Sequence, residues 1–179
     1  MSTDHMKRRL RSDYPFFLSY RTRWSDNDQY AHVNNAIYYH LFDAVVNNYL
    51  IDHCGMHPTK SEQIGLVVSS FCEFFSPVSF PDVLDLGLRV SRLGTSSVTY
   101  EVGVFRAKAR PNDNHIVPAC WQRKQEENPS DTITPVAVGG YTHVFVESTS
   151  RKATPIDAKL KSSLMKLMTH TATTAVSKL

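Results

Sequence analysis

The clearest pattern in the chain is a helical repeat of apolar residues between Asn34 and Cys54. Apolar positions recur three or four residues apart, which is the spacing of one face of an α-helix. Asn34 is a favoured N-terminal cap, and Gly55 is a favoured stop. The pattern predicts a helix of about five turns that is buried on most sides. The positions that carry the repeat are Ile37, Tyr38, Leu41, Phe42, Ala44, Val45, Val46, Tyr49 and Leu50.

Most of the other apolar residues alternate with polar ones, as in strands with one buried face. Leu84 to Val90 and Val98 to Val104 show this alternation best, and Leu93-Gly94-Thr95-Ser96 between them predicts a hairpin turn. A short helix is expected between Pro155 and Met168. In chain order, the predicted strands are 16–25, 65–76, 84–90, 98–104 and 136–147.

The order of these elements predicts an α+β fold of one domain, in which strands after the long helix pair antiparallel and cover it on one face. We assign this domain to residues 14–168. Residues 1–13 are expected to be a flexible tail, and residues 169–179 a second, polar tail. The segment 110–135 holds four prolines and is predicted to be a long loop insert that decorates the surface.

Composition narrows the possible functions. The 179 residues carry 20 basic and 17 acidic side chains, a near balance that gives no support to nucleic-acid binding. No stretch approaches the roughly 20 apolar residues of a membrane span, so we expect a soluble protein. Cys54, Cys72 and Cys120 are too few and too far apart to predict a disulfide framework or a metal knuckle. We therefore predict neither a metal nor a cofactor.

The candidate chemistry lies between the first predicted strand and the long helix. Residues 24–35 contain Asp26, Asp28, His32, Asn34 and Asn35. The first turn of a helix has unpaired backbone N–H groups and a positive dipole end, which bind oxyanions. A carboxylate beside those groups can attack a polarised carbonyl, or activate a water towards it. This arrangement is a minimal hydrolase.

The motif D-x-D-x-x-A-H-V-N-N-x-x-Y over residues 26–38 resembles that of the 4-hydroxybenzoyl-CoA thioesterase group of hotdog-fold proteins. In that group, glycine is usual where this chain has Ala31. The resemblance extends over roughly residues 16–167, and the insert at 110–135 is atypical of the group. Further matching segments are 66–75, 81–84, 93–98 and 138–146.

The resemblance implies an antiparallel sheet wrapped around one central helix, and protomers that pair edge to edge with active sites at their interface. A homodimer or homotetramer acting on an acyl-CoA is therefore expected. Asp28 matches the catalytic carboxylate of the group, as nucleophile or as general base. The backbone N–H groups that polarise the thioester carbonyl match Asn34 and Asn35.

The remaining motif residues have simpler interpretations. Asp26 is expected to hold the loop together by bonding its N–H groups. His32 is expected to order the loop through a hydrogen bond, with general-acid catalysis as the alternative. Asn34 is mainly a helix cap, and Tyr38 is either core or pocket lining.

Two other functions fit the same fold. Hotdog enoyl-CoA hydratases have a proline within the motif and a histidine five residues after the aspartate, whereas His32 is four residues after Asp28 and no proline intervenes. A non-catalytic acyl-CoA-binding or scaffold protein is the second alternative, because a fold does not fix a function. The presence of Asp28 favours the thioesterase.

The last three residues, Ser177-Lys178-Leu179, match the peroxisomal address. We therefore expect the peroxisomal import receptor as a partner and the peroxisome as the location. Acyl-CoA traffic in that organelle is consistent with the motif at residues 26–38.

Removal of residues 177–179 should shift a fluorescent fusion, tagged at its N-terminus, from peroxisomal puncta to the cytosol. Thioesterase activity of the purified protein should not change, because residues 169–176 show no apolar periodicity that would bury them. Fluorescence microscopy of both fusions tests this, and a cytosolic full-length fusion would contradict the expected location.

Overall fold

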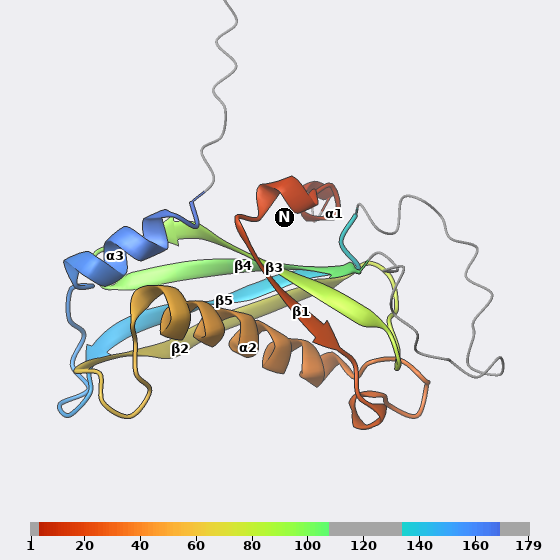
Figure 1. Ribbon diagram of the computed structural model, residues 1–179, viewed down its shortest axis with the longest axis horizontal. Coiled ribbons are helices and arrows are strands. Elements are labelled where there is room, and N and C mark those ends of the chain that lie inside the picture. Colours follow the sequence, from red (N-terminus) through yellow and green to blue (C-terminus); the bar gives the residue numbers. More distant parts are fainter. Residues whose placement is uncertain (1–3, 108–133, 169–179) are drawn as a thin grey trace, which may run out of the picture.

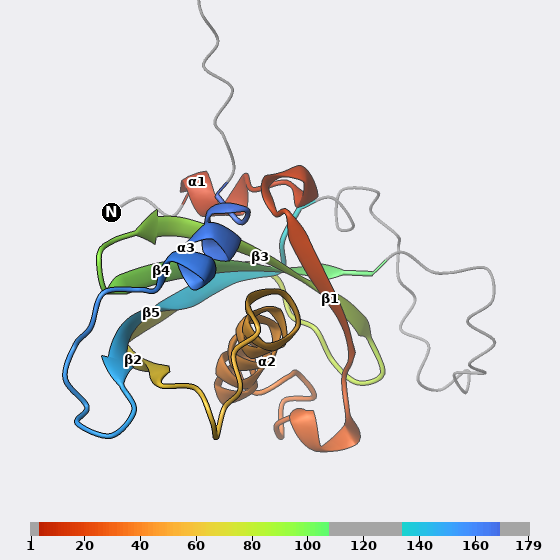
Figure 2. The same ribbon diagram turned by 60° about the vertical axis from the view of Figure 1, so that its left-hand side comes forward.

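The computed structural model of the protein describes residues 4–107 and 134–168. Five antiparallel strands form one sheet in the order β1-β3-β4-β5-β2, and the long helix α2 lies along one face of this sheet (Figure 1). Figure 2 shows α2 nearly end-on, with the sheet curving around it. This is the predicted hotdog architecture. Residues 110–133 of the predicted insert and the predicted tail at 169–179 lie outside the described residues.

The helices and strands agree closely with the sequence pattern. The first strand is the main difference, because it ends at Arg21 where the turn η2 follows, rather than at Ser25. The short helix near the C-terminus is also confirmed. The strands are β1 Phe16–Arg21, β2 Gln63–Phe74, β3 Val83–Leu93, β4 Ser97–Arg106 and β5 Ala137–Glu147; the helices are α1 Asp4–Lys7, α2 Asn35–Cys54 and α3 Ala158–Met165, with 3-10 turns η1 Arg11–Asp13 and η2 Trp24–Asp26.

The core lies between α2 and the concave face of the sheet. Phe42, Val45 and Val46 of α2 have no exposed surface. Gly139 of β5 lies directly beneath Phe42, and a Cβ atom at this position would come within 2.5 Å of the ring. The glycine therefore lets the helix approach the sheet closely. α3 extends the same core with Leu160 and Leu164.

Both ends of α2 are fixed by the residues that the sequence indicates. The Asn34 side chain accepts a hydrogen bond from the Ala36 N–H at 2.9 Å, as an N-terminal cap does. Gly55 takes the left-handed conformation, with φ of 70°, and ends the helix. Among the described helices, none is long and apolar enough to cross a membrane.

Residues 4–13 differ from the predicted flexible tail. They form α1 and η1, and two arginines attach them to the outer face of the sheet, away from α2. Arg9 forms an ion pair with Glu101 of β4 at 2.8 Å, and Arg11 forms one with Asp85 of β3. Each arginine pairs with a carboxylate that is distant in sequence, so the composition of residues 4–13 alone does not predict that this segment contacts the sheet. The structure therefore places these residues against the sheet, where the composition predicts a flexible tail.

Candidate active site

Asp28 lies in a tight loop that its own carboxylate organises. Its Oδ1 accepts hydrogen bonds from the backbone N–H of Tyr30 at 2.8 Å and of His32 at 3.4 Å. The Asp28 N–H donates to the His32 carbonyl at 2.8 Å and closes the loop. Within the described part of the chain, Oδ2 makes no hydrogen bond. One carboxylate oxygen thus holds the loop, and the other is available to a ligand.

Asp26 has a different environment, although it is only two residues away. It is buried, and its carboxylate accepts hydrogen bonds from the Tyr20 hydroxyl at 2.9 Å and from the Arg23 backbone and guanidinium at 2.7 and 3.0 Å. Burial alone would raise the pKa of this carboxyl, but the Arg23 and Tyr20 hydrogen bonds outweigh it and the pKa is lowered. Asp26 therefore stays ionised and saturated with donors, as its predicted structural role requires.

A second loop, residues 75–82 between β2 and β3, holds the Asp28 loop in place. The Asn27 side chain accepts a hydrogen bond from the Phe80 N–H at 3.0 Å, and the Val33 N–H donates to the Val78 carbonyl at 2.8 Å. This second loop is itself fixed by an ion pair between Arg106 and Asp82 at 2.7 Å. About 50 residues separate the two loops along the chain, so no local motif indicates their contact.

The start of α2 supplies the expected N–H group. The Asn34 N–H donates to the Asp26 carbonyl at 2.8 Å, and the Asn34 side chain caps the Ala36 N–H. The Asn35 N–H has no acceptor within residues 4–107 and 134–168. Of the two predicted oxyanion donors, the structure therefore leaves Asn35 available and uses Asn34 to hold the loop against the helix.

Tyr38 and His32 border this region in different ways. Tyr38 is buried, and its ring packs edge-on against Phe74 of β2 with centroids 5.0 Å apart. Burial raises the pKa of Tyr38 to about 12, so the phenol stays protonated at neutral pH. Of its two expected places, the structure puts Tyr38 in the hydrophobic core. The loop-ordering hydrogen bonds expected of His32 come from its main chain, because its ring makes no hydrogen bond to the described residues.

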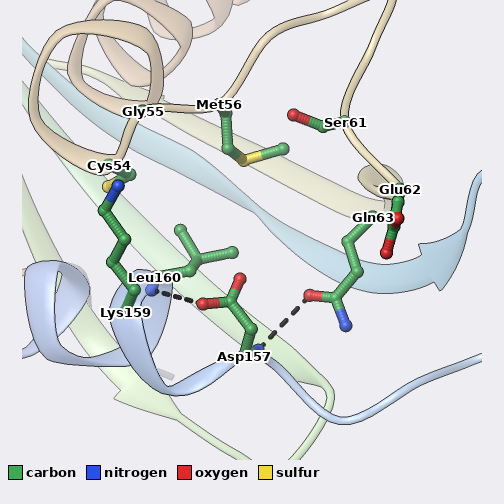
Figure 3. A pocket seen from close by; sticks show the side chains of 9 residues that line it. All are labelled: Cys54, Gly55, Met56, Ser61, Glu62, Gln63, Asp157, Lys159 and Leu160. Carbon is green, nitrogen blue, oxygen red and sulfur yellow. Dashed lines mark hydrogen bonds between the residues drawn. The ribbon is translucent and has the colours of Figure 1, made fainter.

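Within the described part of the chain, the residues of the candidate site are largely exposed. Asp28 is only half-buried, and Asn34 and Asn35 are exposed. A pocket of about 340 Å³ is present at the opposite, C-terminal end of α2 (Figure 3), and none of the predicted site residues lines it. Within the described residues, no group of three potential ligands is placed to hold a metal.

Comparisons with known proteins agree with this geometry. The family model described as "Thioesterase superfamily" matches residues 30–111. The PA5185 protein of Pseudomonas aeruginosa is 40% identical, with a TM-score of 0.73 over 89% of this chain and 95% of that one. Two more distant structures share the fold. A 1,4-dihydroxy-2-naphthoyl-CoA thioesterase from Synechocystis is 13% identical, with a TM-score of 0.65 over 85% of this chain and 96% of its own. An aspartate-to-asparagine mutant of 4-hydroxybenzoyl-CoA thioesterase, complexed with 4-hydroxybenzoyl-CoA, is 18% identical. Its TM-score is 0.64 over 83% of this chain and 97% of that one.

Ala31 carries backbone strain that a glycine would relieve. Its φ is 62°, in the left-handed region, which costs a residue with a Cβ about 1–2 kcal/mol. Ala31→Gly should therefore stabilise the protein by roughly 0.5–1 kcal/mol after the greater entropy of the unfolded glycine chain is subtracted. Urea unfolding measures this change.

Ala44→Gly is the matched control, because Ala44 is exposed in the middle of α2. It should destabilise the protein by about 1 kcal/mol, through helix propensity alone. Destabilisation of similar size in both variants would show that position 31 is not strained.

Proposed function

Because the chain belongs to the thioesterase superfamily, we propose that it hydrolyses an acyl-CoA thioester, with Asp28 as the catalytic carboxylate. One observation carries this proposal. Among the described residues, the half-buried Asp28 carboxylate has one oxygen without a hydrogen bond, and the loop that holds it leads directly into a helix whose Asn35 N–H has no acceptor. The names of the two CoA thioesterases of the same fold support acyl-CoA as the substrate class.

Two groups carry out the proposed reaction, the Asn35 N–H and the Asp28 carboxylate. The Asn35 N–H donates a hydrogen bond to the thioester carbonyl and stabilises the negative charge that develops on this oxygen. Oδ2 of Asp28 either attacks the carbonyl carbon, or removes a proton from a water that attacks it. In both routes the bond from carbon to sulfur breaks, and CoA leaves as the thiolate. In the first route, water then hydrolyses the acyl-aspartyl anhydride.

Asp28→Asn should reduce the kcat for acyl-CoA hydrolysis at least about 100-fold, because the amide is neither a nucleophile nor a base. The loop should keep its shape, since the asparagine oxygen can still accept from Tyr30 and His32. Release of CoA on a panel of acyl-CoAs measures the activity, and circular dichroism checks the fold.

Asp52→Asn is the control, because Asp52 is exposed near the far end of α2. It should retain full activity. A wild-type protein that binds acyl-CoA without releasing CoA would favour the non-catalytic alternative, and hydration of an enoyl-CoA would favour the hydratase.

The same proposal includes a dimer joined through β2. This strand is an edge of the sheet, and its segment Leu66-Val67-Val68 is exposed although it is apolar. An unpaired apolar edge is a template for another strand. A second copy of the same edge pairs with it antiparallel about a two-fold axis and gives a closed assembly.

Val67→Lys should convert this dimer into a monomer with little activity, because the lysine places an uncompensated charge on the apolar edge. Val67 is 52% exposed, and Met165 on α3 is 56% exposed, so Met165→Lys is a control of equal exposure. Sedimentation and turnover measure both variants. A fully active Val67→Lys monomer would show that the sites do not need the second copy.

A further inference from the structure

The second loop, between β2 and β3, contacts the Asp28 loop on both sides of the candidate carboxylate. At Asn27, the side-chain oxygen accepts a hydrogen bond from the Phe80 N–H at 3.0 Å. At Val33, the backbone N–H donates to the Val78 carbonyl at 2.8 Å. Asn27 immediately precedes Asp28 in the chain. The position of the carboxylate therefore depends on the shape of the second loop.

Arg106, at the end of β4, fixes the shape of the second loop. Its Nη1 donates to Asp82 Oδ2 at 2.7 Å, and its Nη2 donates to the Pro77 carbonyl. The same Asp82 oxygen also accepts from the Ser79 N–H at 3.0 Å. The planar guanidinium spans two acceptors in a fixed geometry, which a lysine ammonium does not. Arg106 therefore joins two points of the second loop that enclose both of its contacts with the Asp28 loop.

The position of Arg106 departs from the pattern of its strand. Val102 and Val104 of β4 belong to the core, and the alternation predicts a third apolar residue at position 106. Instead, the Arg106 side chain is charged and 22% exposed, and it pairs with the Asp82 side chain, which is 17% exposed. Such departures from a local rule are expected at functional sites. Both Nη groups of Arg106 already donate and its charge is paired, which disfavours a role in binding the phosphates of CoA.

We propose that Arg106 is a positioning residue for the reaction at Asp28. The inference rests on the proposed function. By fixing the second loop, Arg106 holds the Asp28 carboxylate in its place relative to the Asn35 N–H, and it makes no contact with the substrate. A reacting group must be held within about 0.5 Å of its productive position, and a displacement of about 1 Å can lower the rate about 100-fold. Arg106 therefore acts on kcat and has little effect on KM.

Arg106→Met tests the proposal, because it removes both donors and keeps the apolar stem of the side chain. Its kcat should fall about tenfold or more at a nearly unchanged KM. The same loss should appear with an acyl-N-acetylcysteamine, which carries the thioester without the phosphates of CoA. Arg106→Lys, a milder change that retains the charge, should also lose kcat, because one ammonium does not reproduce the fork. A raised KM for acyl-CoA alone, restored by the lysine, would show that Arg106 binds phosphate and would overturn the inference.

Arg89→Met is the matched control for the loss of a partly buried, ion-paired arginine. Arg89 lies on β3, and its side chain is 16% exposed and 3.8 Å from Glu101 on the outer face of the sheet. This variant should keep the wild-type kcat, since its ion pair lies on the face away from α2. Circular dichroism checks the fold of each variant at the assay temperature. A similar loss of kcat in Arg89→Met and Arg106→Met would show a general effect of destabilisation and would contradict the positioning role.

A double-mutant cycle tests whether Arg106 acts through the contact between the two loops. Asn27→Leu has a similar volume but offers no acceptor to the Phe80 N–H. If the second loop transmits the effect, Arg106→Met and Asn27→Leu together should reduce kcat by less than the product of the two separate reductions. A reduction equal to that product would mean that the two changes act independently, and the inference would fail.

Failure of the proposed function gives a different result, because wild-type protein would then release no CoA from any acyl-CoA. An active wild-type protein, with full kcat in both Arg106→Met and Arg106→Lys, would reject the positioning role and keep the function.

Discussion

The unpaired N–H groups at the start of α2 are the constraint on which the rest of the site depends. Every helix leaves its first N–H groups without intrahelical acceptors. In this chain the Asn34 side chain satisfies the Ala36 N–H, and the Asp26 carbonyl accepts from the Asn34 N–H. Among the residues that the structure describes, the Asn35 N–H has no acceptor. The loop that accepts from the Asn34 N–H also carries Asp28, so one loop both satisfies the helix start and holds the candidate carboxylate.

The sequence predicts the elements well where one physical signal dominates. Burial of one face of α2 produces a repeat over five turns, although the repeat overstates the burial, because Ala44 is exposed. The asparagine and glycine at the ends of the helix fix its length. Prediction fails where partners are distant in sequence. Arg9 and Arg11 look like part of a solvated tail, but Glu101 and Asp85 on the outer sheet face hold them. The pairing of β3 with β4, which creates that face, has no counterpart in the pattern around residue 9.

The candidate site shows the same contrast between local signals, which the sequence predicts, and distant contacts, which it does not. Its motif is continuous in sequence, so Asp26, Asp28 and the helix start could be identified together. The support of the motif is not continuous. Asn27 meets Phe80, and Asp82 meets Arg106, only because the ends of β1, β3 and β4 converge. Likewise, the pocket at the other end of α2 combines three segments whose proximity the sequence does not show.

The two aspartates of the motif show that environment, rather than residue type, decides the role of a carboxylate. Asp26 has 1% of its surface exposed, and both its oxygens accept hydrogen bonds. A reaction at this group would have to break that network, which would leave buried polar groups unpaired at a cost of about 1–3 kcal/mol each. Asp28 uses one oxygen for its loop, and the other makes no hydrogen bond to residues 4–107 or 134–168. A carboxylate with this division can hold its position and still meet a substrate, which is why chemistry at residue 28 does not require the loop to unfold.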